Sequence, residues 1–291
     1  MKYAYIQDNS SSLSISKQCK VLDIHHSGFY AWKKKPISNR QKENQRLTGL
    51  IKQFWLESGS VYGYRKIHQD LLSIGEHCSR NRVGRLMKLA ELKAQVGYKR
   101  KPRTKFGVPS HIAPNRLEQK FDCTRPNQRW VTDITYIKTA EGWLFLAIVL
   151  DLFSRQIIGW SMRNRMETEI IISALMMAVW RRNPKEPVII HSDQGSQYTS
   201  YDWQNFLKQH NFIASHSRRG NCYDNAVAES FFQLLKRERI KRKVYRTRDE
   251  AKADIFDYIE MFYNPKRRHG NNENLSPADY EKSYIRKLKG V

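Results

Sequence analysis

The spacing of apolar positions changes in character near residue 130. Beyond it, five short apolar-rich runs have the length of strands and are bounded by turn residues: 130–138, 142–151, 156–163, 188–191 and 212–215. Helical spacing covers residues 167–182 and 201–210, and a third helix carries Glu229. Three consecutive strands joined by short turns are expected to pair antiparallel. The two strands that follow, each reached through a helix, are expected to join the same sheet. The region therefore predicts an α/β fold with a mixed sheet flanked by helices.

The first 95 residues show helical spacing interrupted by turns. One helical pattern ends at Gly75, and a second follows Ser79, which is suited to cap a helix N-terminus. Two short helices joined by a glycine-containing turn outline a helix-turn-helix, and Arg82 and Arg85 lie off the apolar stripe of the second helix, where DNA would bind. A weaker copy of the pattern covers residues 15–35. A plain helical bundle with a basic surface is the alternative for both.

The charge of the chain favours nucleic acid as the partner. The 291 residues contain 52 Lys and Arg against 28 Asp and Glu, a net charge of +24 with a pI near 9.9. A basic ribosomal protein is the alternative on charge alone. No apolar run approaches the roughly 20 residues that cross a bilayer, and no signal-peptide pattern is present. We therefore expect no membrane association and a cytoplasmic location, and the four scattered cysteines predict free thiols and no zinc site.

These patterns divide the chain into five predicted segments. They are a candidate helix-turn-helix (1–35), a helix-turn-helix-like DNA-binding region (36–96), a basic linker (97–128), an α/β core (129–245) and a C-terminal helical extension (246–291). The linker carries five cations and no acid between residues 99 and 105, and its prolines keep it extended. Such a run is either a solvated tether or a segment that follows DNA phosphates.

Three carboxylates occupy positions where an isolated charge would cost free energy or where a ligand is expected. Asp133 lies inside an apolar strand, Asp193 closes a later apolar run, and Glu229 points away from the apolar stripe of its helix. Carboxylate oxygens suit Mg²⁺ or Mn²⁺, and the carboxyl ends of strands are where open α/β sheets bind ligands. Two such ions about 3.5–4 Å apart support in-line displacement at phosphorus. The sequence therefore predicts metal-dependent cleavage or exchange of phosphodiesters.

The residues around these carboxylates resemble the DDE transposases of bacterial insertion sequences. The matching motifs are residues 130–135 (WVTDIT), 151–155 (DLFSR), 191–198 (HSDQGSQY), 220–230 (GNCYDNAVAES) and 263–269 (YNPKRRH). Thirty-five residues separate Asp193 from Glu229, and Lys236 follows Glu229 by seven positions, a spacing that is highly specific. The group that the chain resembles is the second reading frame of the insertion-sequence-three family, which is related to retroviral integrases. The likeness covers about residues 10–285.

The resemblance implies a ribonuclease H-like integrase catalytic core in which Asp133, Asp193 and Glu229 are catalytic and hold two Mg²⁺ ions, with Mn²⁺ as a substitute. It implies cleavage of insertion-sequence ends and transfer of the 3′-hydroxyl to target DNA, with double-stranded DNA as the partner and Lys236 as a contact to the DNA end. Members of such a family act as homo-oligomers on DNA, in association with the bacterial nucleoid. The upstream-frame protein, as a fusion or in a complex, commonly supplies a further DNA-binding domain.

Several further residues are candidate DNA contacts, each with a structural alternative. Gln197 and Tyr198 follow Asp193 and either touch the DNA strand or pack in the core. The loop before the Glu229 helix adds four more candidates: Arg218, Arg219, Asn221 and Asn225. This loop either grips phosphates or is fixed by Asp224 as a helix cap. Residues 236–248, with eight cations and one acid, are interpreted as a track for the DNA backbone.

Two residues near the motifs are assigned structural roles. Asp151 is expected to fix the turn after the second strand rather than to bind metal, and His191 is expected to be hydrogen-bonded within its strand. Two other functions compete with transposition. A structure-selective nuclease on the same fold would hydrolyse without joining, and a non-catalytic DNA binder would need only the cations.

Overall fold

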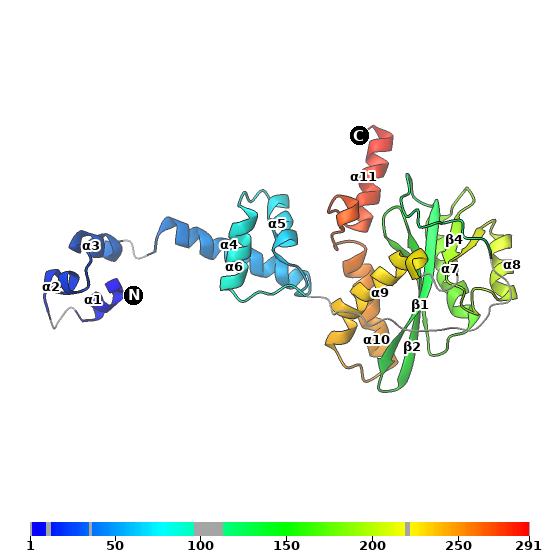
Figure 1. Ribbon diagram of the computed structural model, residues 1–291, viewed down its shortest axis with the longest axis horizontal. Coiled ribbons are helices and arrows are strands. Elements are labelled where there is room, and N and C mark those ends of the chain that lie inside the picture. The colour runs from blue at the N-terminus through cyan, green and yellow to red at the C-terminus, as the bar shows by residue number, and fades with distance from the viewer. Residues whose placement is uncertain (1, 10–12, 35–36, 96–112, 219–221, 291) are drawn as a thin grey trace. The chain divides into compact units, whose positions relative to one another are not determined.

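The computed structural model describes residues 2–9, 13–34, 37–95, 113–218 and 222–290. They belong to two compact units, Met1–Ala94 and Gln95–Val291, which Figure 1 shows in blue to cyan and in green to red. Half of the predicted linker, residues 97–112, lies outside the described residues, as do Arg219 and Asn221. Each unit is described by itself.

The first unit is helical, as predicted. Its helices are α1 (Lys2–Asp8), α2 (Ile15–Val21), α3 (His26–Lys34), α4 (Asn39–Glu57), α5 (Tyr64–Ser73) and α6 (Arg80–Leu89). The helices α1, α2 and α3 pack around Ile6, Cys19 and Phe29, whereas α4, α5 and α6 pack on one another. Ser79 caps α6 as predicted, because its hydroxyl accepts a hydrogen bond from the Arg82 N–H at 3.2 Å.

The second unit is built on a five-stranded sheet. Its strands are β1 (Arg129–Thr139), β2 (Gly142–Asp151), β3 (Ile157–Arg163), β4 (Ile189–Ser192) and β5 (Ile213–His216). The strand order is β3-β2-β1-β4-β5, in which β1, β2 and β3 pair antiparallel while β4 runs parallel to both β1 and β5. The predicted mixed sheet is confirmed, with boundaries within two residues of those expected from the apolar runs.

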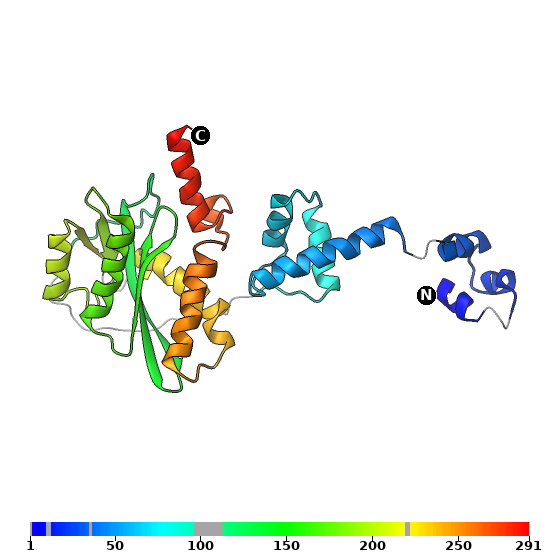
Figure 2. The ribbon, with the colours of Figure 1, turned by 180° about the vertical axis from the view of Figure 1, so that it is seen from behind.

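Helices cover both faces of this sheet (Figures 1 and 2). On one face, α7 (Thr168–Arg182) packs against β2 and β3 and also contacts α8 (Tyr201–Gln209). On the other face, α9 (Ala226–Glu238) and α10 (Arg248–Phe256) pack against β1. Gly159 permits the close approach of α7, since a Cβ there would lie 2.1 Å from the Ala174 carbonyl oxygen. The sheet is thus buried between two helical layers.

The chain after α10 returns to the sheet instead of leaving it. A π-helical segment, Asp257–Tyr263, continues α10, and α11 (Pro277–Lys289) follows. The Asn264 side chain pairs with both the N–H and the carbonyl of Ile157 on β3, at 3.0 and 2.9 Å. Glu281 on α11 accepts hydrogen bonds from the Arg182 side chain at the end of α7. The predicted C-terminal extension therefore packs as part of the same compact unit as the core.

Within the described parts of the chain, no helix has the length and apolar character needed to span a membrane. Cys19, Cys78 and Cys123 are free thiols, as expected. Burial raises the pKa of the Cys123 thiol to about 11, so it stays protonated at neutral pH.

Candidate active site

The parallel pairing of β1 and β4 brings the first two predicted carboxylates together. Val131 on β1 is in register with His191 on β4. Asp133 lies two residues after Val131 on β1, and Asp193 lies two residues after His191, one residue past the end of β4, so the register leads both carboxylates toward the same end of adjacent strands. The pairing ends here because β4 stops at Ser192, which leaves Asp193 at the carboxyl end of its strand. The sheet itself therefore creates the aspartate pair.

Electrostatic effects confirm that charges converge on Asp133. Burial raises the pKa of Asp133 well above its ordinary range, and the neighbouring charge of Asp193 raises it further, with a smaller contribution from Glu229. Two effects lower the pKa: a hydrogen bond of 2.8 Å from the Ile134 N–H and the charge of Lys236. Asp133 therefore lies within electrostatic reach of every other charged member of the predicted site.

Asp193 lies at the exposed rim of the pair. Displacement of water by surrounding protein atoms raises the pKa of Asp193, although a 3.0 Å hydrogen bond from the Gly195 N–H and the charge of His216 act against this. A Cβ at position 195 would lie 3.1 Å from the Asp193 Oδ1, so glycine keeps this loop close to the carboxylate. The carboxylate is accessible from solvent and is held by backbone.

The helix α9 brings the third carboxylate to β1. Phe231 and Leu235 are buried, and Ala228 and Phe232 add to the buried stripe. Glu229 lies in the first turn of α9, half-buried, on the part of the helix whose charge reaches Asp133. Among the residues that the structure describes, no three His, Cys, Asp or Glu side chains lie close enough together to hold one ion. The structure thus shows an aspartate pair with Glu229 nearby.

Lys236 follows two turns after Glu229 on α9. Its Nζ lies 4.9 Å from the centre of the Tyr136 ring, which is on β1 beyond the point where β4 ends. Tyr136 is half-exposed, and its ring meets the Trp143 ring edge-on at 5.2 Å. A cation held on an aromatic ring beside the aspartate pair suits contact with an anionic ligand.

Two of the residues after Asp193 have different environments. Tyr198 is 1% exposed, and its hydroxyl lies 3.2 Å from the Thr132 hydroxyl within the α7–α8 core. The prediction that Tyr198 contacts DNA is therefore wrong, and the packing alternative holds, because its ring is enclosed by protein. Gln197 is partly exposed and donates a hydrogen bond of 3.1 Å to the Met166 carbonyl oxygen. Gln197 stays a candidate contact.

The loop before α9 is fixed by a buried carboxylate. Asp224 is fully buried and accepts hydrogen bonds from the Arg218 N–H, the Asn115 amide and the Gln119 amide, at 2.8, 2.9 and 3.0 Å. It does not cap α9, because the cap position is Asn225, which makes no side-chain capping bond. The alternative of an Asp224 cap is therefore wrong, and Asp224 instead joins residues that are distant in sequence.

Other predicted DNA contacts are also engaged within the protein. The Arg218 guanidinium pairs with Asp224 at 3.3 Å, although most of its side chain is exposed. Asn225 is 5% exposed. In the first unit, the Arg82 guanidinium donates to the Asn44 Oδ1 at 2.7 and 3.0 Å and thereby ties α6 to α4, whereas Arg85 is exposed. Of these residues, Arg85 is the one most available to a ligand.

The basic run 236–248 is partly used inside the protein. Several of its eight cations bind protein groups, among them Arg237 to Glu238, Arg239 and Lys243 to Asp254, and Arg248 to the Glu141 carbonyl oxygen. These contacts attach the run to the α10 side of the unit. Less of its charge is therefore available to a DNA backbone than the sequence indicates.

Asp151 and His191 have the structural roles that the sequence predicted. The Asp151 carboxylate accepts hydrogen bonds from the N–H groups of Asn127 and Phe153, both at 2.9 Å, and burial raises the pKa of Asp151 to about 6. His191 is fully buried between the hydroxyls of Ser215 and Ser217, and burial lowers the pKa of His191 to about 4. Both predictions are confirmed.

Comparisons with known proteins agree with this architecture. A family model described as "Integrase core domain" matches residues 123–222, and a second model with that description matches residues 229–285. A model described as "HTH-like domain" matches residues 42–101, which supports the helix-turn-helix prediction for α5 and α6. The family models thus identify the second unit as an integrase core, which is joined in this chain to an HTH-like DNA-binding region.

Curated relatives then show the family. The transposase InsF for insertion sequence IS3A of Escherichia coli (strain K12) is 40% identical over 285 residues, which cover 97% of this chain and 98% of the relative. An IS600 uncharacterized 31 kDa protein of Shigella sonnei is 39% identical over 266 residues, which cover 91% and 98%. The chain belongs to the insertion-sequence-three (IS3) family of transposases. Its function is DNA transposition and integration, a polynucleotidyl transfer.

Solved structures give weaker likenesses. A chain in the cryo-EM structure of the simian T-cell lymphotropic virus intasome with PP2A regulatory subunit B56 gamma is 15% identical, with a TM-score of 0.46 over 79% of this chain and 74% of that chain. The HTLV-2 integrase catalytic core domain in complex with magnesium is 17% identical, with a TM-score of 0.42 over 54% and 98%. These TM-scores carry no functional argument.

Proposed function

We propose that Asp133, Asp193 and Glu229 are the catalytic carboxylates of this transposase and that they hold two Mg²⁺ ions, for which Mn²⁺ can substitute. The observation that carries the proposal is the register of β1 and β4, which leads Asp133 and Asp193 to neighbouring positions, where the charge of Asp193 raises the pKa of Asp133. Oxygen donors of this kind, partly open to solvent, fit a hard divalent cation that keeps several waters. A bound ion would relieve the repulsion that raises the pKa of Asp133.

The reaction is cleavage at the ends of the insertion sequence followed by transfer of the 3′-hydroxyl to target DNA. Bound divalent ions supply Lewis-acid stabilisation of the attacking and leaving oxygens. The residues of the chain bind and orient: Lys236, on the Tyr136 ring, contacts a phosphate of the DNA end, and Gln197 lies at the rim beside Asp193.

DNA recognition is assigned to the first unit. In the α5–α6 pair, α6 exposes Arg85 and Lys88 on the side opposite its buried residues Val83 and Met87, as a recognition helix would. The α2–α3 pair is proposed as a second, weaker helix-turn-helix. We further expect the transposase to act as a homo-oligomer that pairs two DNA ends, with the upstream-frame protein as a possible added partner. Sedimentation with and without end DNA measures whether the transposase forms this homo-oligomer.

The test is nicking and joining of a supercoiled plasmid carrying insertion-sequence ends, with Mg²⁺ or Mn²⁺ and with a chelator. Metal-dependent joined products in the wild type, lost in Glu229→Gln, are expected. Products that are nicked but never joined would favour a nuclease. Products that are unchanged in Glu229→Gln would refute the carboxylate assignment, and DNA binding without any metal-dependent product would favour a non-catalytic binder.

A further inference from the structure

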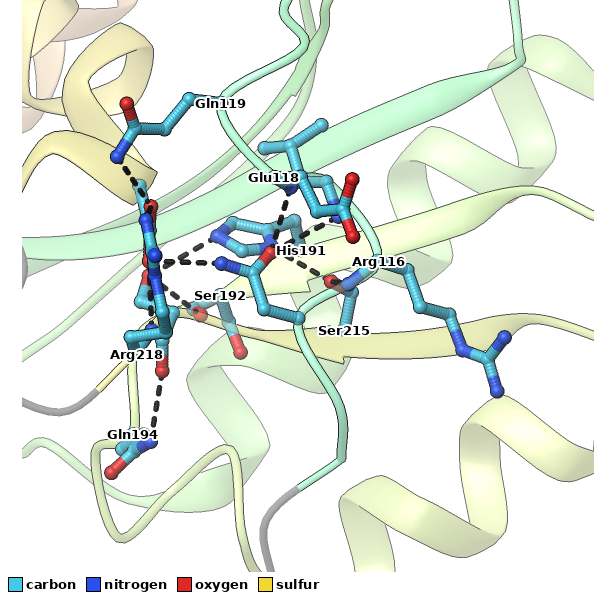
Figure 3. Close-up of polar contacts among 12 residues, drawn as sticks. Arg116, Glu118, Gln119, His191, Ser192, Gln194, Ser215 and Arg218 are labelled. Atoms are coloured by element: carbon cyan, nitrogen blue, oxygen red, sulfur yellow. Dashed lines mark hydrogen bonds and ion pairs between the residues drawn. The ribbon is translucent and has the colours of Figure 1, made fainter.

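A short segment at the start of the second unit lies across its sheet edge and reaches the active-site elements. Residues 113–119, here called the strap, precede β1 and run beside β5. The strap is anchored by Leu117, which is fully buried, and by a turn in which the Asn115 Oδ1 accepts hydrogen bonds from the N–H groups of Leu117 and Glu118, at 3.1 and 2.9 Å. Figure 3 shows Arg116, Glu118 and Gln119 around His191, Ser215 and Arg218.

One connection of the strap runs to the helix of Glu229. The amides of Asn115 and Gln119 both donate to the Asp224 carboxylate, at 2.9 and 3.0 Å. Asp224 is fully buried and lies two residues before α9, and five before Glu229. Although burial alone would raise it, the hydrogen bonds from Arg218 and Gln119 hold the pKa of Asp224 below its ordinary value. Asp224 therefore stays ionised and keeps its donors.

A second connection runs to the strand of Asp193. The Arg116 N–H donates to the Ser215 hydroxyl at 2.9 Å, and that hydroxyl lies 2.9 Å from the His191 Nδ1. His191 is two residues before Asp193 on β4. At the start of the strap, the Ala113 N–H donates to the His216 Nδ1 at 2.8 Å. The strap is thus bonded to β5 and to Asp224, and it reaches the strand before Asp193 and the helix of Glu229 through them.

The backbone of the strap is held in a costly conformation. Glu118 and Gln119 have φ angles of 48° and 60°, in the left-handed region that residues other than glycine rarely adopt. Two consecutive residues of this kind persist only where surrounding contacts over-determine them. Here those contacts are the Asn115 turn on one side and Asp224 on the other.

We propose that the strap is a positioning element of the active site, in which Asn115 and Gln119 act through Asp224 to fix the start of α9 and hence Glu229. This inference rests on the proposed role of Glu229 as a metal-binding carboxylate. Asp224 and Gln119 are positioning residues, since neither is among the carboxylates proposed to bind the metal. Loosening of the strap would weaken metal binding by allowing Glu229 to move, before it unfolds the unit.

The cleanest change is Gln119→Glu, because the Gln119 side chain is exposed apart from its bond to Asp224. It replaces a donor by a second carboxylate of the same shape and so repels Asp224. Asp224→Asn breaks the same contact from the other side. The double variant Gln119→Glu/Asp224→Asn restores a donor facing an acceptor and keeps the net charge. The matched control is Gln209→Glu, the same substitution at an exposed position of α8.

The experiment measures the rise in melting temperature of the full chain as MnCl₂ is added, together with the Mn²⁺ concentration that half-saturates plasmid joining. Each single variant is expected to raise both half-saturating concentrations on the order of tenfold, as for residues that orient metal ligands. The double variant recovers most of this loss, and the control behaves as wild type. Amide hydrogen exchange without metal is expected to accelerate in the first turn of α9 but not in α11.

The outcomes separate the two proposals. If Glu229→Gln abolishes the response to Mn²⁺ while both single strap variants keep the wild-type response, the strap inference is wrong and the carboxylate assignment stands. If Glu229→Gln itself leaves the response unchanged, the carboxylate assignment fails and the strap inference fails with it. If both single variants have a weakened response to Mn²⁺ and the double variant does not recover the wild-type response, the substitutions loosen the unit in general. The specific role of the contact between Gln119 and Asp224 is then refuted.

Discussion

The second unit contains two kinds of buried or half-buried acid, which differ in whether other protein groups pair with them. At one end of α9, Asp133 and Asp193 lie side by side and their pKa values are raised by desolvation and, for Asp133, by mutual charge. At the other end, Glu238 is 1% exposed and is bonded by the Arg267 guanidinium at 2.7 and 2.9 Å and by the Tyr258 hydroxyl at 2.6 Å.

The difference separates acids that stabilise the fold from acids that cost stability. Asp254, which binds Lys243 at 2.7 Å and the Tyr245 hydroxyl at 2.6 Å, follows the pattern of Glu238, and these donors lower its pKa despite its burial. A group paired in this way destabilises the fold when its partner is removed. A group that is destabilised in the metal-free fold is instead expected at a functional site. The comparison therefore predicts that substitutions at the aspartate pair and at the Glu238 pair change the stability of the metal-free fold in opposite directions.

The largest effect is expected on catalysis. Asp193→Asn should reduce strand joining by on the order of a thousandfold or more, equivalent to roughly 4 kcal/mol of transition-state stabilisation, because a metal-binding oxygen is lost. Joining of labelled oligonucleotides measures it. Asp257→Asn, the same change at an exposed position beside α10, serves as the control and should retain full activity. Joining by Asp193→Asn at the control rate would contradict the assignment.

The next largest effect is expected on stability. Arg267→Met leaves the buried Glu238 carboxylate without its bidentate partner and should lower the free energy of unfolding by about 3 kcal/mol. Urea unfolding measures the change, with Lys266→Met, at the exposed neighbouring position, as the control. The double variant Glu238→Met/Arg267→Met should lose less than Arg267→Met alone. An equal loss in both would show that Glu238 is not the cause.

A smaller effect of opposite sign is expected at the aspartate pair. Because the pKa of Asp133 is raised in the folded state, metal-free stability falls as the pH rises from the ordinary aspartate pKa through the raised one. Asp133→Asn removes this loss and should raise the melting temperature in chelator by a few degrees, since about 1 kcal/mol corresponds to 2–4 °C in a unit of this size. This gain in melting temperature should vanish near pH 4, because Asp133 is then protonated in the folded wild type. A lower melting temperature at neutral pH would show that Asp133 stabilises the fold.

The smallest effect compares two arginines of α6. Arg85→Ala should lower affinity for DNA several-fold and reduce the dependence of log affinity on log salt by about one, with stability within roughly 0.5 kcal/mol of wild type. Arg82→Ala should instead lower stability by about 1–3 kcal/mol, because Asn44 loses its partner. Salt titrations of DNA binding and thermal unfolding separate the two. Equal losses of affinity without loss of stability would assign both arginines to DNA.

The elements of the second unit were largely predictable from local patterns. Alternation in the strands, helical spacing in residues 167–182 and the stop at Pro184 all depend on neighbours along the chain, and the structure confirms them. The candidate carboxylates were also visible in the sequence, because Asp133 interrupts an apolar strand. The structural roles of Asp151 and His191 were likewise indicated by their positions at a turn and within a strand.

The sites where prediction failed all depend on contacts between distant residues. Tyr198 was named as a DNA contact, but α8 and Thr132 enclose its ring. Asp224 was given as an alternative helix cap, but it does not cap α9, and beside the nearby Arg218 N–H its donors come from residues 115 and 119, more than a hundred positions earlier. Several cations in residues 236–248 proved to bind protein groups. No periodicity or spacing carries such information.

The sequence by itself determined the class of the protein, because the element order, the spacing of Asp193, Glu229 and Lys236, and the excess of basic residues are properties of the chain alone. Tertiary structure decided which polar side chains serve the fold and which serve the ligand. The physical reason is that burial and pairing are not local: a charge is free to act on a ligand only where folding brings no partner to it. For Asp224 and Glu238 folding supplies those partners, and for Asp133 it supplies another acid.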